Sequence, residues 1–292
     1  MIDNTVRNRD EILEALATYR HHVAARNRYA LEQYVPLAEA AVAPEEEEAA
    51  DDSDLEAVDE EGIAFERMEF LAHFTGHDLD RPLAGGLTLE RPADLLTHYD
   101  AVAPQLGLDG TCRSPKTSEE ARRQKRTEYV AEMEAYLKAH CLPSVRDDIA
   151  FPAELLVVAE QVDCLHGPGL APEQEQKGIP FWSMEDGPPT LIEEPEQLAN
   201  AACLDSVTDD LEVAGGWCCG HGYPGNAYVL LCREIGAGDE VPWRWKYTIE
   251  IAYTAQLFHS IPELLEAYKD TCAVDTAVYP EYGVEDVFGG VL

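Results

Sequence analysis

The chain has 292 residues, 46% of them hydrophobic, which is enough for one large domain or two small ones with a sizeable core. Lys and Arg total 21 against 57 Asp and Glu, a formal net charge of −36, and such a surface repels nucleic acids and anionic membranes. There is no run of 18 uncharged apolar residues for a membrane span and no apolar stretch of a signal peptide near the first residue. We therefore expect a cytoplasmic protein that binds a basic protein partner, with neither nucleic acid nor membrane as partner.

The excess of acid extends along the whole chain. Residues 1–62 hold 5 basic and 17 acidic side chains, a net charge of −12, which leaves −24 for the remaining residues. One interpretation is an acidic docking face that attracts a basic partner. The other is a composition shared by the whole proteome, such as adaptation to salt, and the presence of only six Lys residues fits it.

Eight cysteines occur in the C-terminal two-thirds of the chain. A disulfide framework is typical of short secreted chains. This chain is long, and we do not expect it to be secreted. We therefore expect most of the cysteines to be small buried apolar groups. They are Cys112, Cys141, Cys164, Cys203, Cys218, Cys219, Cys232 and Cys272.

The first segment has the apolar spacing of a helix. Apolar residues recur over residues 12–35 at intervals of three and four, and the helix is predicted to end at Pro36. Residues 1–42 are therefore interpreted as a helical N-terminal region. Residues 45–61 contain eleven acidic side chains and no basic one, so the segment 43–62 is predicted to be a disordered linker or loop.

Residues 63–110 are predicted to be a second helical segment. A buried helix ends near Gly76, and a short helix covers residues 93–99. His73 and His77 have a zinc-ligand spacing, but the Glu beside the first His of a metalloprotease helix is missing and no third ligand is evident. We interpret them as a solvated pair. The apolar residues of the buried helix are Phe65, Met68, Phe70, Leu71 and Phe74.

A group of cations, the basic island, opens the next helix. Thr117 and Glu120 have the spacing of a capping box, and Tyr129 and Met133 begin a single apolar face. Acids three and four residues from the cations predict a solvated, ion-paired surface and argue against nucleic-acid binding. The cations are Arg113, Lys116, Arg122, Arg123, Lys125 and Arg126.

A shorter helix follows, which a Phe-Pro pair at 151–152 begins and a Gly-Pro-Gly sequence at 167–169 ends. Cys164 and His166 stand two apart and would form half of a metal site, but no matching half follows them. Residues 179–182 then predict a short strand or an anchor into the core.

The clearest strand signals come next. Residues 227–232 form a near-continuous apolar run, typical of a central strand, and residues 236–239 form a turn. Over residues 243–253 large apolar side chains alternate with other residues, which predicts a half-buried antiparallel strand. Ser260 and Glu263 have capping-box spacing and begin a last helix.

A Cys-Cys-Gly-His sequence before these strands suggests a metal site or a nucleophile. Its possible zinc ligands are Cys218, Cys219 and His221, with Cys203 or Cys232. However, an extended backbone sends adjacent cysteines to opposite faces of a strand. A base two or three residues from a nucleophile seldom reaches it, although folding can bring His166 or His259 close.

Gly220, Gly222 and Gly225 match the G-x-G-x-x-G pattern of dinucleotide-binding turns. They precede a strand and do not open a helix, so the context is wrong for that function. We interpret residues 215–225 as a Gly-rich approach to the sheet.

Several short motifs occur in a recognisable order. They are Leu142-Pro143, the FPAELL sequence at 151–156, the Gly-rich loop at 167–170, Gly216-Trp217, the strand at 228–232 and the SIPELLEAY sequence at 260–268. Over about residues 125–272 this order resembles the SUKH superfamily, and within it the fungal cell-wall assembly regulators. A long Pro-rich insertion before Gly216 departs from a compact member. The resemblance implies helices packed on an antiparallel sheet and a protein-binding module without catalytic residues. Fungal members act in cell-wall and signalling networks, and many bacterial members are immunity proteins that neutralise toxins.

We therefore expect an α+β fold with helices packed on an antiparallel sheet, in which residues 111–292 form the SUKH-like domain. The predicted function is a non-catalytic protein-interaction module with a strongly acidic surface and no cofactor or metal. It would act in signalling or cell-wall regulation, or as an immunity-type protein that neutralises a toxin. The alternative is a cysteine- or zinc-dependent hydrolase centred on Cys218 and His221.

Overall fold

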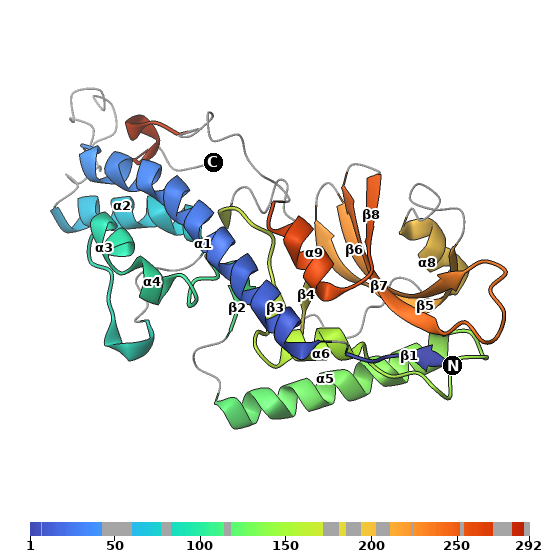
Figure 1. Cartoon of the computed structure of the whole chain (residues 1–292). Helices are drawn as coiled ribbons and strands as arrows, with labels where there is room; N and C mark the ends of the chain where they lie inside the picture. Colours follow the sequence, from blue (N-terminus) through green and yellow to red (C-terminus); the bar gives the residue numbers. More distant parts are fainter. Residues whose placement is uncertain are drawn as a thin grey trace, which may run out of the picture.

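The computed structural model describes residues 1–6, 8–42, 60–76, 83–113, 118–171, 181–184, 194–202, 211–222, 225–251, 254–270 and 282–288. Within them the fold is α+β, as predicted, with helices packed on a sheet and a helical N-terminal region (Figure 1). Most of the segment predicted as an acidic linker, residues 43–59, lies outside the described residues. None of the described helices is both long and apolar enough to cross a membrane.

The described helices are α1 (Arg9–Ala40), α2 (Glu60–Thr75), α3 (Pro92–Thr97), α4 (Tyr99–Val102), α5 (Glu119–His140), α6 (Ala153–Ala159), α8 (Pro195–Ala201) and α9 (Ile261–Tyr268), with 3-10 turns η2 (Ala84–Gly86) and η4 (Val284–Asp286). The described strands are β1 (Ile2–Asp3), β2 (Thr111–Cys112), β3 (Cys164–Leu165), β4 (Trp182–Ser183), β5 (Leu211–Gly222), β6 (Gly225–Glu234), β7 (Trp243–Ile251) and β8 (Thr254–Phe258).

Helix α1 begins at an asparagine cap and continues past the proline at which we expected it to end. The side chain of Asn8 accepts a hydrogen bond from the backbone N–H of Glu11. Pro36 lies inside the helix. The predicted end was wrong because Val35 and Ala38 are buried beside the proline, and their packing offsets the hydrogen bond that Pro36 cannot donate.

The same helix spans two hydrophobic cores. Its first half packs with α5, α6, α9 and the main sheet in one core, the sheet core. Its second half packs with α2, α3, α4 and η4 in the other, the helical core. In the sheet core the rings of Tyr19 and Tyr268 stack with their centroids 5.6 Å apart. The N-terminal region is thus attached to the body that contains the sheet.

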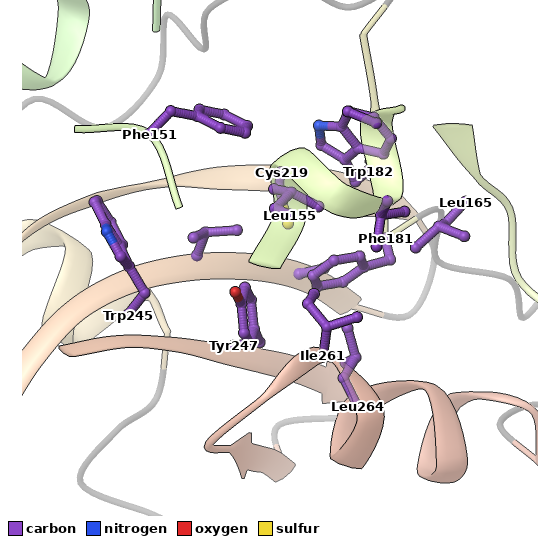
Figure 2. Packing of buried hydrophobic residues seen from close by; sticks show 14 of the residues in the cluster. Phe151, Leu155, Leu165, Phe181, Trp182, Cys219, Trp245, Tyr247, Ile261 and Leu264 are labelled. Atoms are coloured by element: carbon purple, nitrogen blue, oxygen red, sulfur yellow. The ribbon is translucent and has the colours of Figure 1, made fainter. Parts of the chain in front are cut away.

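Large side chains fill both cores. In Figure 2 the ring of Phe181 points toward Tyr247, and the two centroids lie 6.1 Å apart. Phe181 and Trp182 are almost fully buried and β4 begins at Trp182, so the described part of the predicted segment, residues 181–182, anchors into the core and starts a strand. The sheet core includes Tyr19, Phe151, Phe181, Trp182, Trp217, Trp245, Tyr247 and Tyr268, and the helical core includes Leu31, Tyr34, Phe70, Leu71, Phe74 and Tyr99.

The main sheet has the strand order β1-β7-β6-β5, with β8 also paired to β7. The predicted central strand, β6, lies between β5 and β7, and these pairs and β7–β8 are antiparallel. The main sheet is thus antiparallel, as predicted, except at β1, which pairs with β7 in parallel. No hairpin connects β1 to β7, so the connection does not impose an antiparallel direction.

One face of β7 is apolar, as predicted, and the other face is covered toward the end of the strand. Trp245 and Tyr247 point into the sheet core, while Thr248 and Glu250, on the opposite face, are only 0% and 8% exposed. Thr248 lies between Tyr228 on β6 and residue 257 on β8. The expectation of a half-buried strand therefore holds at Arg244, which is exposed, and is wrong at Thr248 and Glu250. The second face carries a cluster that we call the α8 cluster, formed by Leu198, Ala202, Val213, Cys218, Tyr228, Leu230 and Cys232.

The predicted helix starts are close to the observed ones. Helix α6 begins directly after the Phe-Pro pair, and the hydroxyl of Ser260 caps α9 by accepting a hydrogen bond from the N–H of Glu263. The cap of α5 is Ser118, one residue after the predicted Thr117. The hydroxyl of Ser118 accepts from the N–H of Ala121.

Candidate functional site

Cys218 and Cys219 lie on opposite faces of β5, as the alternation of a strand requires. Cys219 belongs to the sheet core and Cys218 to the α8 cluster. Adjacent thiols that point apart cannot bind one metal ion. Cys203 lies outside the described residues. Among those described, neither Cys218 nor Cys232 belongs to a group of three side chains close enough to share a metal.

The structure instead brings Cys218, His221 and Asn226 into a chain of contacts. The Sγ atom of Cys218 lies 3.6 Å from Nε2 of His221, and Nδ1 of His221 lies 2.8 Å from Oδ1 of Asn226. Thiol, imidazole and amide in this order are the groups of a Cys–His–Asn hydrolase. Asn226 was not among the residues predicted from the sequence, because only the register of the β5–β6 hairpin places it opposite His221.

The surroundings of this thiol oppose a role as nucleophile. Cys218 is 7% exposed, and its Sγ–H donates to the carbonyl oxygen of Gly220 at 3.4 Å. Burial raises the pKa of Cys218 to about 11 and raises that of Cys219 well above its ordinary value. Because the thiolate is the reactive form, this raised pKa opposes reactivity of Cys218 at neutral pH.

Within the described residues, neither the predicted His73–His77 pair nor the G-x-G-x-x-G motif forms a site. His77 lies outside the described residues. His73 packs its ring against Phe74 and Tyr282, with centroids 5.3 Å and 6.3 Å apart, so it is not the solvated side chain that we expected. Its neighbours are aromatic because α2 packs against the segment around Tyr282. The glycines of the G-x-G-x-x-G pattern lie on β5 and β6 and open no helix.

Within the described part of the basic island, Arg113, Arg122 and Arg123 form ion pairs, but the island is not uniformly solvated. Arg123 pairs with Glu120 at the exposed surface. Arg122, however, is 3% exposed and pairs with the buried Asp163, so the prediction of a solvated face was wrong at this residue. A buried carboxylate on another segment provides the partner, which spacing along one helix does not reveal. Arg113, outside the helix, pairs with Glu119.

The possible metal ligands Cys164 and His166 do have a third possible ligand beside them, Cys112. Sγ of Cys164 lies 3.2 Å from Nε2 of His166. Strand β2 pairs with β3 so that Cys112 is directly opposite Cys164. The predicted absence of a matching half concerned residues after the pair, whereas the third ligand, Cys112, precedes the pair in sequence and strand pairing brings it close.

A cavity of about 570 Å³ opens at the edge of β7. On this edge β1 pairs with Trp243 and Arg244, and β8 pairs from Tyr247 onward, which leaves Trp245 and Lys246 between the two among the described strands. Charges of both signs line the cavity, so it favours neither an anion nor a cation. They are Arg233, Arg244 and Lys246, with Asp3, Glu154 and Glu234.

The turn between β6 and β7, residues 234–241, combines exposed acids with exposed apolar side chains, and we call it the hairpin tip. Glu234, Asp239 and Glu240 are exposed. Ile235 and Val241 are 61% and 40% exposed. Within the described part of the chain no ion pair reaches these three acids, because the neighbouring arginines pair elsewhere, Arg233 with Glu212 and Arg244 with Asp3.

Most of the described arginines likewise form ion pairs with carboxylates of the same chain. Arg20, for example, pairs with the buried Asp109 at 2.7 Å. The arginines in ion pairs are Arg9, Arg20, Arg28, Arg91, Arg113, Arg122, Arg123, Arg233 and Arg244. The uncompensated charge of the described surface is therefore carried by carboxylates.

No protein-family model matches the chain, and no curated protein and no solved structure matches it.

Proposed function

We propose that the protein is a non-catalytic interaction module that binds a basic protein partner, with the hairpin tip as the place of contact. The observation that carries the proposal is the tip itself, three exposed acids beside the apolar Ile235 and Val241. A patch of this composition suits a partner segment that carries Lys or Arg around an apolar side chain.

Electrostatics supports a basic partner. A net charge of −36 produces a long-range field that accelerates encounter with cations and excludes acidic competitors. Since Arg233 and Arg244 are already paired, the acids at the tip are available to charges from outside the chain.

The tip is also held on a rigid base. It connects β6 and β7, which are paired from Gly225 to Cys232. At the start of β7 the guanidinium of Arg233 lies over the ring of Trp243, 4.2 Å from its centroid. A rigid base reduces the entropy that binding must overcome.

The SUKH-like interpretation is retained as part of the proposal. The helices α5, α6 and α9 and the strands β5, β6 and β7 occur in the order on which the resemblance rests. Such a module would act in signalling or cell-wall regulation or neutralise a basic toxin, and it needs no catalytic residue for either role.

The test is affinity capture from an extract of the source organism, with two baits compared side by side. One bait is the full chain and the other is the full chain with Glu234→Gln, Asp239→Asn and Glu240→Gln. We expect the first bait to retain proteins with a basic isoelectric point that the second does not retain. Each such protein is then purified and its Kd measured by calorimetry.

A matched control variant distinguishes contact from bulk charge. Glu69→Gln, Glu132→Gln and Asp147→Asn remove the same charge from exposed positions elsewhere. This variant should bind like the unmodified chain. If both triple variants weaken the Kd equally, contact at the tip is wrong, and if no basic protein is retained, the proposed function is wrong.

A thiol hydrolase is the second candidate, and the Cys218–His221–Asn226 contact chain favours it. It requires a reactive Cys218 thiolate. Iodoacetamide treatment of the native chain, followed by peptide mass mapping, measures this reactivity. Modification of Cys218 at neutral pH, at a rate near that of the unfolded chain and lowered by His221→Ala, would support the hydrolase. An unmodified Cys218 would exclude it.

A further inference from the structure

Three side chains with metal-binding chemistry meet in the small sheet β2-β3-β4. They are Cys112, Cys164 and His166, and each offers one ligand atom such that all three atoms lie within 4.8 Å of one another. Thiolate sulfur and imidazole nitrogen are the ligands that zinc prefers in proteins.

The strand register places these side chains. Cys112 on β2 and Cys164 on β3 are Cα partners in an antiparallel pair, so their side chains leave the same face of the small sheet. His166 follows β3 by one residue, and its Nε2 atom lies 3.2 Å from the Sγ atom of Cys164.

The spacing fits one tetrahedral ion. With a Zn–S bond of about 2.3 Å and a Zn–N bond of about 2.0–2.1 Å, tetrahedral ligand atoms lie about 3.5–3.8 Å apart. The three atoms of the cluster lie within 4.8 Å of one another, so small rotations of the side chains bring them to this geometry.

The backbone that carries the ligands is fixed by long-range hydrogen bonds. The N–H of Asp163 donates to the carbonyl oxygen of Cys112 at 2.7 Å, and the N–H of His166 donates to that of Gly110 at 2.9 Å. The hydroxyl of Tyr19 donates to the carbonyl oxygen of His166. A backbone held in this way presents ligands with little entropy to lose on binding.

Gly110 is required at this position. Its φ of +76° is in the left-handed region, and a Cβ atom added there would lie 2.8 Å from the Tyr19 ring. The absence of a side chain lets Tyr19 approach both Gly110 and the loop that carries His166.

The charges also balance. Two thiolates and a neutral imidazole carry two negative charges, which a divalent cation neutralises. Both charged residues adjacent to the ligands in sequence are already paired, Asp163 with Arg122 at 2.9 Å and Arg113 with Glu119. The cluster therefore provides a complete set of three protein ligands without an unpaired carboxylate beside it.

We propose that Cys112, Cys164 and His166 bind one zinc-type divalent cation, whose fourth position is filled by water or another small ligand. The bound ion joins β2 to β3 between the helical core and the sheet core. The proposal uses no residue of the hairpin tip, so its outcome and that of the proposed function are independent.

The test uses the full chain, reduced and then loaded with Co²⁺ as a spectroscopic substitute for Zn²⁺. We expect about one Co²⁺ per chain, thiolate-to-cobalt charge-transfer absorption and the intense d–d bands of a tetrahedral site. Cys112→Ala and His166→Ala should each weaken the Kd for Co²⁺ by at least about tenfold. Both side chains are partly exposed, so circular dichroism should show both variants folded.

Cys218→Ala is the matched control, because it removes a thiol beside the histidine of the main sheet. It should leave the Co²⁺ stoichiometry and spectrum unchanged. Zinc should raise the Tm of the unmodified chain and of Cys218→Ala but not that of His166→Ala. The proposal is overturned if the reduced chain binds no Co²⁺, if Cys218→Ala abolishes binding while Cys112→Ala does not, or if reduced Cys112 and Cys164 reoxidise to a disulfide in the presence of excess Co²⁺.

Discussion

Arg122 on α5 and Asp163 before β3 form a buried ion pair across forty-one positions of sequence. Nη2 of Arg122 lies 2.9 Å from Oδ1 of Asp163, and its Nε atom lies 3.1 Å from the same oxygen. The two residues are 3% and 5% exposed. The pair attaches the long helix α5 to the small sheet, next to Cys164.

Breaking this pair should be costly, because Arg122 stays buried and keeps only the exposed carboxylate of Glu119 as a counter-charge. We expect Asp163→Ala to lower the free energy of unfolding by about 3–5 kcal/mol, measured by urea denaturation. Glu120→Ala, which removes the exposed partner of Arg123, should change it by less than about 0.5 kcal/mol. Equal effects of the two substitutions would show that the Asp163 pair is not desolvated in solution.

The start of α9 is held from two sides. The hydroxyl of Ser260 caps the helix, and Oε2 of Glu154 on α6 accepts the backbone N–H of Ile261 at 2.9 Å. Thermal or urea unfolding should show a loss of about 1 kcal/mol for Ser260→Ala and of about 1–3 kcal/mol for Glu154→Ala. Glu266→Ala, at an exposed position of α9, is the control and should be neutral within about 0.5 kcal/mol. An unchanged stability of Glu154→Ala would mean that water replaces the carboxylate at this helix start.

Two glycines with positive φ should respond differently to alanine. At Gly216, with φ of +146°, a Cβ atom would lie 2.2 Å from the carbonyl oxygen of Val229, so it would force β5 away from β6. At Gly236, with φ of +76°, no atom lies within 4 Å of the added Cβ. We expect Gly216→Ala to destabilise the protein by about 3 kcal/mol or more, and Gly236→Ala by about 1–2 kcal/mol. Comparable urea midpoints for the two variants would contradict the close approach of β5 and β6.

Buried thiols should make the protein less stable at high pH. Burial raises the pKa of Cys141 and Cys218 to about 11 and that of Cys232 to about 12. Unfolded thiols ionise near pH 8.5, so their contribution is complete below about pH 8.5 and is lost as the pH rises toward 11 to 12. Each thiol should lower the free energy of unfolding by about 1.4 kcal/mol per pH unit in that range.

Urea denaturation from about pH 7.5 to about pH 10.5 measures this loss. Cys218→Ala removes one of the three groups, so its stability should fall less steeply with pH than that of the unmodified chain. Identical pH dependence in the two proteins would show that the Cys218 thiol ionises equally well when folded.

Secondary structure could be predicted from the sequence where the local pattern of apolar residues matches the burial of the folded chain. The apolar run at 227–232 and the alternation from 243 predicted β6 and β7, and Ser260 with Glu263 predicted the start of α9. The sequence did not predict the structure correctly where contacts with a distant segment determine it. Only tertiary packing covers the second face of β7 or carries α1 through Pro36, and no local spacing indicates either.

The same distinction holds for the candidate sites. Alternation along β5 predicted that Cys218 and Cys219 point apart. Asn226 beside His221, and Cys112 opposite Cys164, depend on strand register, which a single sequence does not specify. The hairpin tip was predicted only as a turn at residues 236–239, because the pairing of Arg233 and Arg244 with other acids is evident only in the folded chain.

The electrostatic account of binding is tested by the Kd of a captured basic partner for the full chain and the tip variant, measured from about 50 mM to about 500 mM NaCl. For the full chain the Kd should rise steeply with salt. At low salt the triple substitution at Glu234, Asp239 and Glu240 should weaken binding by about threefold to about a hundredfold, as three ion pairs of about 0.2–1 kcal/mol each imply. The two proteins should converge at high salt. A Kd that is independent of salt and the same for both proteins would contradict electrostatic capture at the hairpin tip.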